Sequence, residues 1–128
     1  MKDLSPKEAH EFMHANPDAR LVDVRSGMEF LFVGHPVGAI HVPWIDEPDW
    51  EINPDFALEI GKIATRSQPI LLICRSGNRS HEAKQVLEAS GFEKVSNILH
   101  GFEGDLDPTR KRSTVNGWRY DNLPWEQC

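Results

Sequence analysis

Residues 70–80 read ILLICRSGNRS, and this stretch decides the fold. Its leading apolar residues, Ile70 to Ile73, are typical of a central parallel strand that is covered on both faces. Cys74 follows at once, and a short polar loop leads from it into a segment whose apolar residues have helical spacing. In open α/β sheets ligands bind at the carboxyl ends of the strands, so this cysteine lies where a functional residue is expected.

Strands and helices alternate on both sides of this stretch. Short apolar segments predict further strands at residues 21–24, 39–42 and 95–98. Helices are expected over about residues 6–15, 54–64 and 79–90. The first of them begins at a capping box, Ser5–Glu8, which has proline at the first helical position. The alternation predicts an α/β fold, with a mostly parallel central sheet and helices on both faces.

The composition fits a single domain over residues 1–128, with no repeat, low-complexity tract or linker that would divide it. Apolar residues make up 39% and charged residues 27%, and the longest apolar run is far too short to span a bilayer. The net charge of −6 disfavours nucleic acid and anionic membranes as partners. The first residues lack the features of a secretory signal, so we expect a soluble, cytoplasmic protein.

Cys74 has the surroundings of a reactive thiol. The chain has 2 cysteines, Cys74 and the last residue, Cys128, which are too few for a disulfide framework. Backbone N–H groups of the loop and of the helix start, together with Arg75 and Arg79, favour the thiolate. Such surroundings lower cysteine pKa values from about 8.5 to roughly 3.5 to 7.5. The alternative, a small buried cysteine at the end of a strand, is disfavoured by the two arginines and by Gly77.

Four separated segments carry a resemblance to a known family. They are residues 21–30 (LVDVRSGMEF), 34–43 (GHPVGAIHVP), 74–80 (CRSGNRS) and 123–124 (LP). Together they resemble the rhodanese (thiosulfate sulfurtransferase) family over about residues 20–125, which implies a single rhodanese-like domain. The chain departs from the family pattern where His100–Gly101 stands in place of a Gly-Gly pair, and where Asn122 precedes Leu-Pro. These departures affect the C-terminal wall of the pocket and leave the cysteine loop intact.

The resemblance implies a sulfurtransferase with Cys74 as its catalytic residue. The thiolate would take a sulfane sulfur from a donor such as thiosulfate, hold it as a persulfide and pass it to an acceptor. The implied partners are a small anionic donor and a thiol, cyanide or protein acceptor, and the implied cycle needs no metal or organic cofactor. The implied substrate-binding residues are Arg75, Ser76, Gly77, Asn78, Arg79 and Ser80. Among them, Arg75 and Arg79 would hold an anionic donor.

Asp23 and Arg25 form a charged pair at the end of an early strand. A charged pair in such a place is more often a hydrogen-bonding group that fixes neighbouring loops than a catalytic group. We therefore expect both residues to support the site.

Two other functions remain as alternatives. Cysteine phosphatases and arsenate reductases use a Cys-x5-Arg loop, which is one residue longer than the Cys-x4-Arg from Cys74 to Arg79. A non-catalytic rhodanese-like binding or regulatory module typically lacks the cysteine, which is present here. Loop length and the cysteine therefore favour sulfur transfer over both alternatives.

Two further features have plainer interpretations. Residues 10–14 (HEFMH) match the H-E-x-x-H pattern of zinc proteases. Ala9, Phe12 and Met13 are expected to face the core, which leaves His10 and His14 at the flank without a third ligand, so we expect no metal site. The last residue is expected to be an exposed tail, with relay of sulfur as its alternative role.

Overall fold

A parallel sheet of four strands, in the order β3-β1-β4-β5, forms the centre of the computed structural model, which describes residues 1–128. The strands are β1 (Arg20–Asp23), β3 (Ile40–His41), β4 (Ile70–Ile73) and β5 (Val95–Asn97). All three pairings within this sheet are parallel. The carboxyl ends of the strands therefore meet at one edge, where Cys74 begins the loop after β4.

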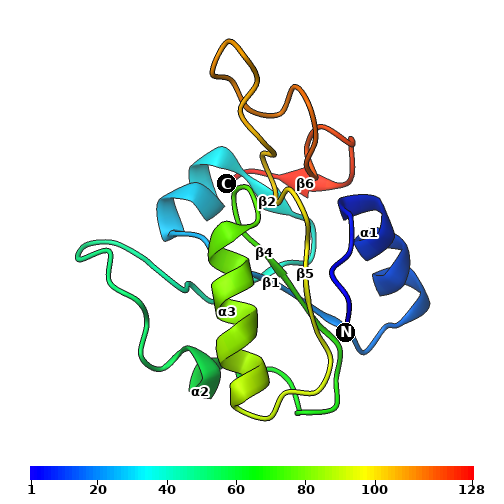
Figure 1. The fold of residues 1–128 in the computed structure, drawn as a ribbon, viewed down its shortest axis with the longest axis vertical. Helices are drawn as coiled ribbons and strands as arrows, with labels where there is room; N and C mark the ends of the chain where they lie inside the picture. Colours follow the sequence, from blue (N-terminus) through cyan, green and yellow to red (C-terminus); the bar gives the residue numbers. More distant parts are fainter.

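Helices cover both faces of the sheet. In Figure 1, α1 (Pro6–Ala15) lies on one side of the strands, and α2 (Phe56–Ile60) and α3 (Asn78–Ala89) lie on the other. The side chains of β4 alternate between the two faces. Ile70 and Leu72 pack into the cluster with α2 and α3, whereas Leu71 and Ile73 pack into the cluster with α1, and all four are fully buried. The predicted central strand and the predicted layers are confirmed.

The start of α1 is fixed by the predicted capping box. Ser5 Oγ accepts a hydrogen bond from the Glu8 amide (3.1 Å), and the Glu8 carboxylate accepts one from the Ser5 amide (2.9 Å). Such caps stabilise a helix by about 1 kcal/mol. Ala9 is buried, and Phe12 and Met13 pack partly buried against the same cluster, so the inward face is the predicted one.

The middle helix is shorter than predicted. It ends at Ile60 and not at residue 64, because Gly61 follows and the next residues form a tighter turn, with hydrogen bonds to the third residue back. It begins at Phe56, after a turn in which Asn53 Oδ1 accepts the amide hydrogen of Asp55 (3.0 Å).

Residues 26–38, for which the sequence predicts no helix or strand, have regular structure in part. They contain a π-helical turn, η1 (Glu29–Val33), and the short strand β2 (His35–Pro36). β2 pairs antiparallel with β6 (Trp125–Glu126) at the end of the chain, and the two lie side by side in Figure 1. Each strand is 2 residues long, so sequence alternation could not reveal either.

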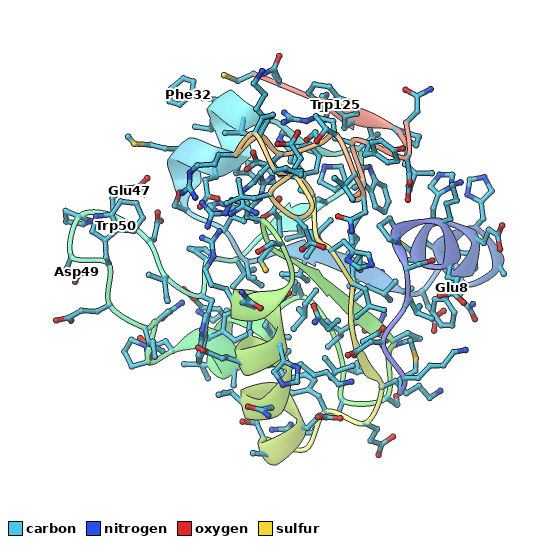
Figure 2. All side chains as sticks on the ribbon, turned by 45° about the horizontal axis from the view of Figure 1, so that its top comes forward. Glu8, Phe32, Glu47, Asp49, Trp50 and Trp125 are labelled. Atoms are coloured by element: carbon cyan, nitrogen blue, oxygen red, sulfur yellow. The ribbon has the colours of Figure 1, made fainter.

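Two of the exposed aromatic side chains lie on η1 and on the irregular segment before α2. Phe32 on η1 is 66% exposed and Trp50 before α2 is 56% exposed, and Figure 2 shows both directed away from the body of the domain. None of the helices has the length and apolar character needed to cross a membrane.

Candidate active site

Cys74 lies directly after β4 with its side chain only 1% exposed. Its Sγ accepts two hydrogen bonds, one from the Gly77 amide (3.1 Å) and one from Ser80 Oγ (3.1 Å). Gly77 has a φ of 109°, a left-handed conformation that glycine adopts without strain, and α3 begins at the next residue. The tight turn therefore points an N–H group back at the sulfur, and hydrogen bonds of this kind stabilise a thiolate.

The segment after β5 holds the cysteine loop from outside. The Phe102 amide donates to the Cys74 carbonyl (2.8 Å), and the Glu103 amide donates to the Arg75 carbonyl (2.9 Å). Gly101 allows this approach, since a Cβ there would lie 2.6 Å from the Arg75 carbonyl carbon. We name residues 101–104 the backbone clamp. The departure at His100–Gly101 therefore leaves the glycine that contacts the loop in place.

Asn97, at the end of β5, links the loop to α3, and the sequence did not single it out. Its Oδ1 accepts from Ser80 Oγ, and its Nδ2 donates to the Gly77 carbonyl (3.1 Å). It is only 4% exposed, and Asp3 Oδ1 accepts its backbone amide hydrogen (3.0 Å). The available signal was an amide side chain at the carboxyl end of the strand next to β4.

Arg79 is engaged by Glu29, which lies on η1. The two groups form a bidentate ion pair, with Nη1 to Oε1 at 2.8 Å and Nη2 to Oε2 at 2.9 Å. Burial raises the pKa of Glu29, but its hydrogen bonds and ion pair with Arg79, and those from Ser26, lower it to about 2. The pKa of Arg79 is raised, chiefly by the hydrogen bond to Glu29. Binding of a donor by Arg79 stays a prediction, and this guanidinium already has a carboxylate partner.

The other predicted substrate-binding side chains lie at the rim. Arg75 is exposed and its side chain forms no hydrogen bond or ion pair. Ser76 and Asn78 lie on the outer flank of the loop, where they help to line a polar pocket of about 510 Å³ together with His81 and His100. Of the loop side chains, only Ser80 reaches the sulfur.

Asp23 and Arg25 form a fully buried ion pair at the end of β1. Arg25 Nε donates to Asp23 Oδ1 (2.9 Å) and Nη2 donates to Oδ2 (2.6 Å) and to the Gly34 carbonyl. The guanidinium also stacks on the Phe102 ring, 4.6 Å from its centroid. The pair thus joins β1 to the chain after η1 and to the backbone clamp. Nη1 of Arg25 has no hydrogen-bond partner.

The remaining predicted features lie away from the sulfur. The rings of His10 and His14 are 5.2 Å apart on α1, and that of His10 packs edge-on against Trp118. No group of three or more His, Cys, Asp or Glu side chains is placed to hold a metal ion. Cys128 is exposed, but its amide donates to the Leu31 carbonyl (3.2 Å), so the last residue rests on η1 and is not a free tail.

Known proteins are similar to this chain in sequence. The sequence profile described as Rhodanese-like domain matches residues 5–106. Thiosulfate sulfurtransferase GlpE from Haemophilus influenzae is 32% identical over 103 residues, which cover 80% of this chain and 86% of that protein. Thiosulfate sulfurtransferase 16, chloroplastic, from Arabidopsis thaliana is 35% identical over 101 residues, or 77% and 82% of the two chains.

Comparison with solved structures indicates the same family as the comparison of sequences. The crystal structure of Rv0390 from M. tuberculosis has a TM-score of 0.90 and 38% identity, over 100% of this chain and 98% of that chain. The profile match covers β1, the Cys74 loop, β5 and the backbone clamp. The chain belongs to the rhodanese-like domain family.

Proposed function

We propose that the protein is a sulfurtransferase that carries a sulfane sulfur as a persulfide on Cys74. One observation carries the proposal: a buried sulfur at a strand-to-helix turn accepts hydrogen bonds from the Gly77 amide and from the Ser80 hydroxyl. Relatives named thiosulfate sulfurtransferase support the same reaction class.

The first half-reaction loads the cysteine. With thiosulfate as donor, the Cys74 thiolate forms a bond to the terminal sulfur, and the bond from that sulfur to the sulfonate sulfur breaks. The electron pair of that bond leaves with sulfite, and the enzyme keeps a persulfide anion. The Gly77 amide already donates to Sγ and the Ser80 hydroxyl lies within hydrogen-bond distance of it, so little reorganisation is needed to support the attacking thiolate.

The second half-reaction empties the site. A nucleophilic acceptor, cyanide or a thiolate of a small molecule or protein, attacks the outer sulfur. The bond between the two sulfur atoms breaks, and its electron pair returns to Cys74 as the thiolate. The proposed cycle moves one sulfur atom and uses no metal or organic cofactor.

Two features argue against phosphoryl transfer at the same cysteine. Four residues separate Cys74 from Arg79, which is one fewer than in the Cys-x5-Arg loops. In addition, Arg79 is held by Glu29 and is not free to bind phosphoryl oxygens. The proposal therefore excludes Cys74-dependent hydrolysis of p-nitrophenyl phosphate.

The test is loading of the cysteine followed by turnover. Mass spectrometry after incubation with thiosulfate should show one added sulfur atom on Cys74, and added cyanide should remove it as thiocyanate. Cys74→Ser should abolish both results. Cys128→Ser is the matched control and should keep them. Loading on Cys128 alone, or turnover in Cys74→Ser, would refute the proposal.

A further inference from the structure

We infer that Glu29 is a specificity-determining residue, which by neutralising Arg79 makes the site favour sulfur donors of low negative charge over the thiosulfate dianion. The favoured class comprises monoanions with a transferable terminal sulfur, such as thiosulfonates and persulfides of uncharged thiols. The inference rests on the proposed sulfur transfer by Cys74 and concerns which donor the site prefers.

The ion pair between Glu29 and Arg79 is stable in the folded protein. Nη1 and Nη2 of Arg79 each donate to one carboxylate oxygen of Glu29, at 2.8 and 2.9 Å. The side chain of Arg79 is only 24% exposed and that of Glu29 only 21%. Ser26 also holds the carboxylate, since its Oγ donates to Glu29 Oε1 (3.0 Å). Separating such a pair leaves a partly buried charge without its partner, so a donor does not easily displace Glu29 from Arg79.

The other arginines near the loop are mostly neutralised too. Arg25 is paired with Asp23 in the interior, and Arg119 lies 3.8 Å from Glu103 of the backbone clamp. The exceptions have no carboxylate partner. They are Arg75, which is exposed, and Arg112, whose Nη1 donates to the Gly104 carbonyl (2.8 Å). Of the two arginines in the cysteine loop, only Arg75 therefore offers uncompensated positive charge to an incoming anion.

Charge matters because the attacking group is itself an anion. The Coulomb energy scales with the product of the charges. Loss of one positive charge from the site therefore costs a dianion about twice what it costs a monoanion at the same place. Arg79 lies on the first turn of α3, next to Ser80, whose hydroxyl donates to Cys74 Sγ, so its neutralisation by Glu29 acts on a donor at the sulfur as well.

Methanethiosulfonate is the matched donor, because it also presents a terminal sulfur bonded to an oxidised sulfur but carries one negative charge fewer. The Cys74 thiolate forms a bond to its terminal sulfur, and the bond from that sulfur to the sulfonyl sulfur breaks. The electron pair leaves with methanesulfinate, as it leaves with sulfite in the case of thiosulfate. The two donors therefore differ mainly in charge.

The experiment measures kcat and KM for both donors, with cyanide as acceptor. In Glu29→Gln the ratio of kcat/KM for thiosulfate to that for methanethiosulfonate should rise about tenfold over the native protein, which corresponds to about 1.4 kcal/mol. Most of the change should lie in KM for thiosulfate. Glu29→Asp keeps the charge and should keep the native ratio. Glu88→Gln, which removes an exposed carboxylate near the far end of α3, is the control and should leave the ratio within twofold.

A double variant keeps the inference testable if Glu29→Gln folds poorly. Glu29→Gln with Arg79→Gln removes both charges, and its ratio should equal the native one, whereas Arg79→Gln alone should lower the ratio. An unchanged ratio in both single variants would overturn the inference while leaving sulfur transfer intact. Failure of the native protein with both donors would instead refute the proposed function.

Discussion

Asn97 Nδ2 donates a hydrogen bond to the Gly77 carbonyl at 3.1 Å, from a strand that neighbours the one carrying the cysteine. The same side chain accepts from Ser80, which in turn reaches Cys74 Sγ. Ser80 has one hydroxyl proton and two acceptors within reach, so Asn97 and the sulfur compete for it. A thiolate is the stronger acceptor, and ionisation of Cys74 would draw that proton toward the sulfur.

We predict that Asn97→Ala lowers the kcat for sulfur transfer by about tenfold to a hundredfold, because the turn at Gly77 loses its tie to β5. Steady-state thiosulfate:cyanide kinetics check this. Ser96→Ala is the matched control on the same strand, since Ser96 bonds to the Lys2 carbonyl and not to the loop. Equal losses in both variants would assign the effect to β5 as a whole.

Ser80→Ala should slow alkylation of Cys74 by iodoacetamide at pH 7 by about tenfold or more, because a hydrogen bond to a charged group contributes about 1.5 to 3 kcal/mol. Ser76→Ala, in the same loop but without a bond to the sulfur, should react like the native protein. If Ser80→Ala is alkylated at the native rate, the Ser80 hydroxyl does not stabilise the Cys74 thiolate.

Gly101→Ala should destabilise the domain and reduce activity together, since its Cβ would meet the Cys74 and Arg75 backbone. Its φ of 63° adds strain of about 1 kcal/mol or more for a residue with a side chain. Gly38→Ala separates the two effects, because Gly38 also has a positive φ (84°) but no atom lies within 4 Å of the new Cβ. Urea unfolding should show a larger loss of unfolding free energy in Gly101→Ala than in Gly38→Ala. Comparable losses would mean that close contact between Gly101 and the cysteine loop does not contribute to stability.

Asp23→Asn should lower the free energy of unfolding by about 3 to 5 kcal/mol, because it leaves the Arg25 guanidinium buried without its counter-ion. Glu103→Gln, which breaks the longer pair with Arg119 at 3.8 Å, should cost about 1 kcal/mol or less. Urea denaturation of the two variants gives the comparison. A small effect of Asp23→Asn would mean that another group compensates Arg25.

Acid should weaken the Glu29–Arg79 pair in a defined range. The pKa of Glu29 falls from an ordinary 4.5 to about 2 in the folded protein. A lowered folded pKa means that the stabilisation is complete above about pH 4.5, declines as the pH falls and is lost once the pH passes about 2. The stability difference between the native protein and Glu29→Gln should shrink over this range, as measured by urea unfolding. The other lowered carboxyl groups, including Asp107, are present in both proteins and cancel from the difference.

Local signals in the sequence were sufficient to predict the main helices, the central strand and the class of fold. The capping box at Ser5 lies within one helical turn, and the four apolar residues of β4 lie in one run, so each element could be predicted without knowing its neighbours. The helix after Cys74 followed from the same reasoning. The class of fold and the position of the cysteine at the sheet edge needed no further information.

Contacts between segments that are distant in the sequence could not be predicted from such local signals. Glu29 and Arg79 are 50 residues apart, and nothing in either segment marks the other as its partner. The pairing of β2 with β6 depends on a register set by the whole fold. For this reason the sequence predicted two arginines available for a donor, whereas the folded chain leaves only Arg75 of that pair without a carboxylate.

The backbone clamp has a consequence for the newly made chain. A ribosome synthesises Cys74 well before Phe102, whose amide later binds the cysteine carbonyl, and before Asn97, which ties down Gly77. Until those residues emerge and β5 docks beside β4, the nascent polypeptide carries Cys74 at the edge of an unfinished sheet. A polypeptide interrupted before residue 97 would therefore contain Cys74, Gly77 and Ser80 but lack the side chain that holds the turn in place, and under the proposed function it should transfer no sulfur.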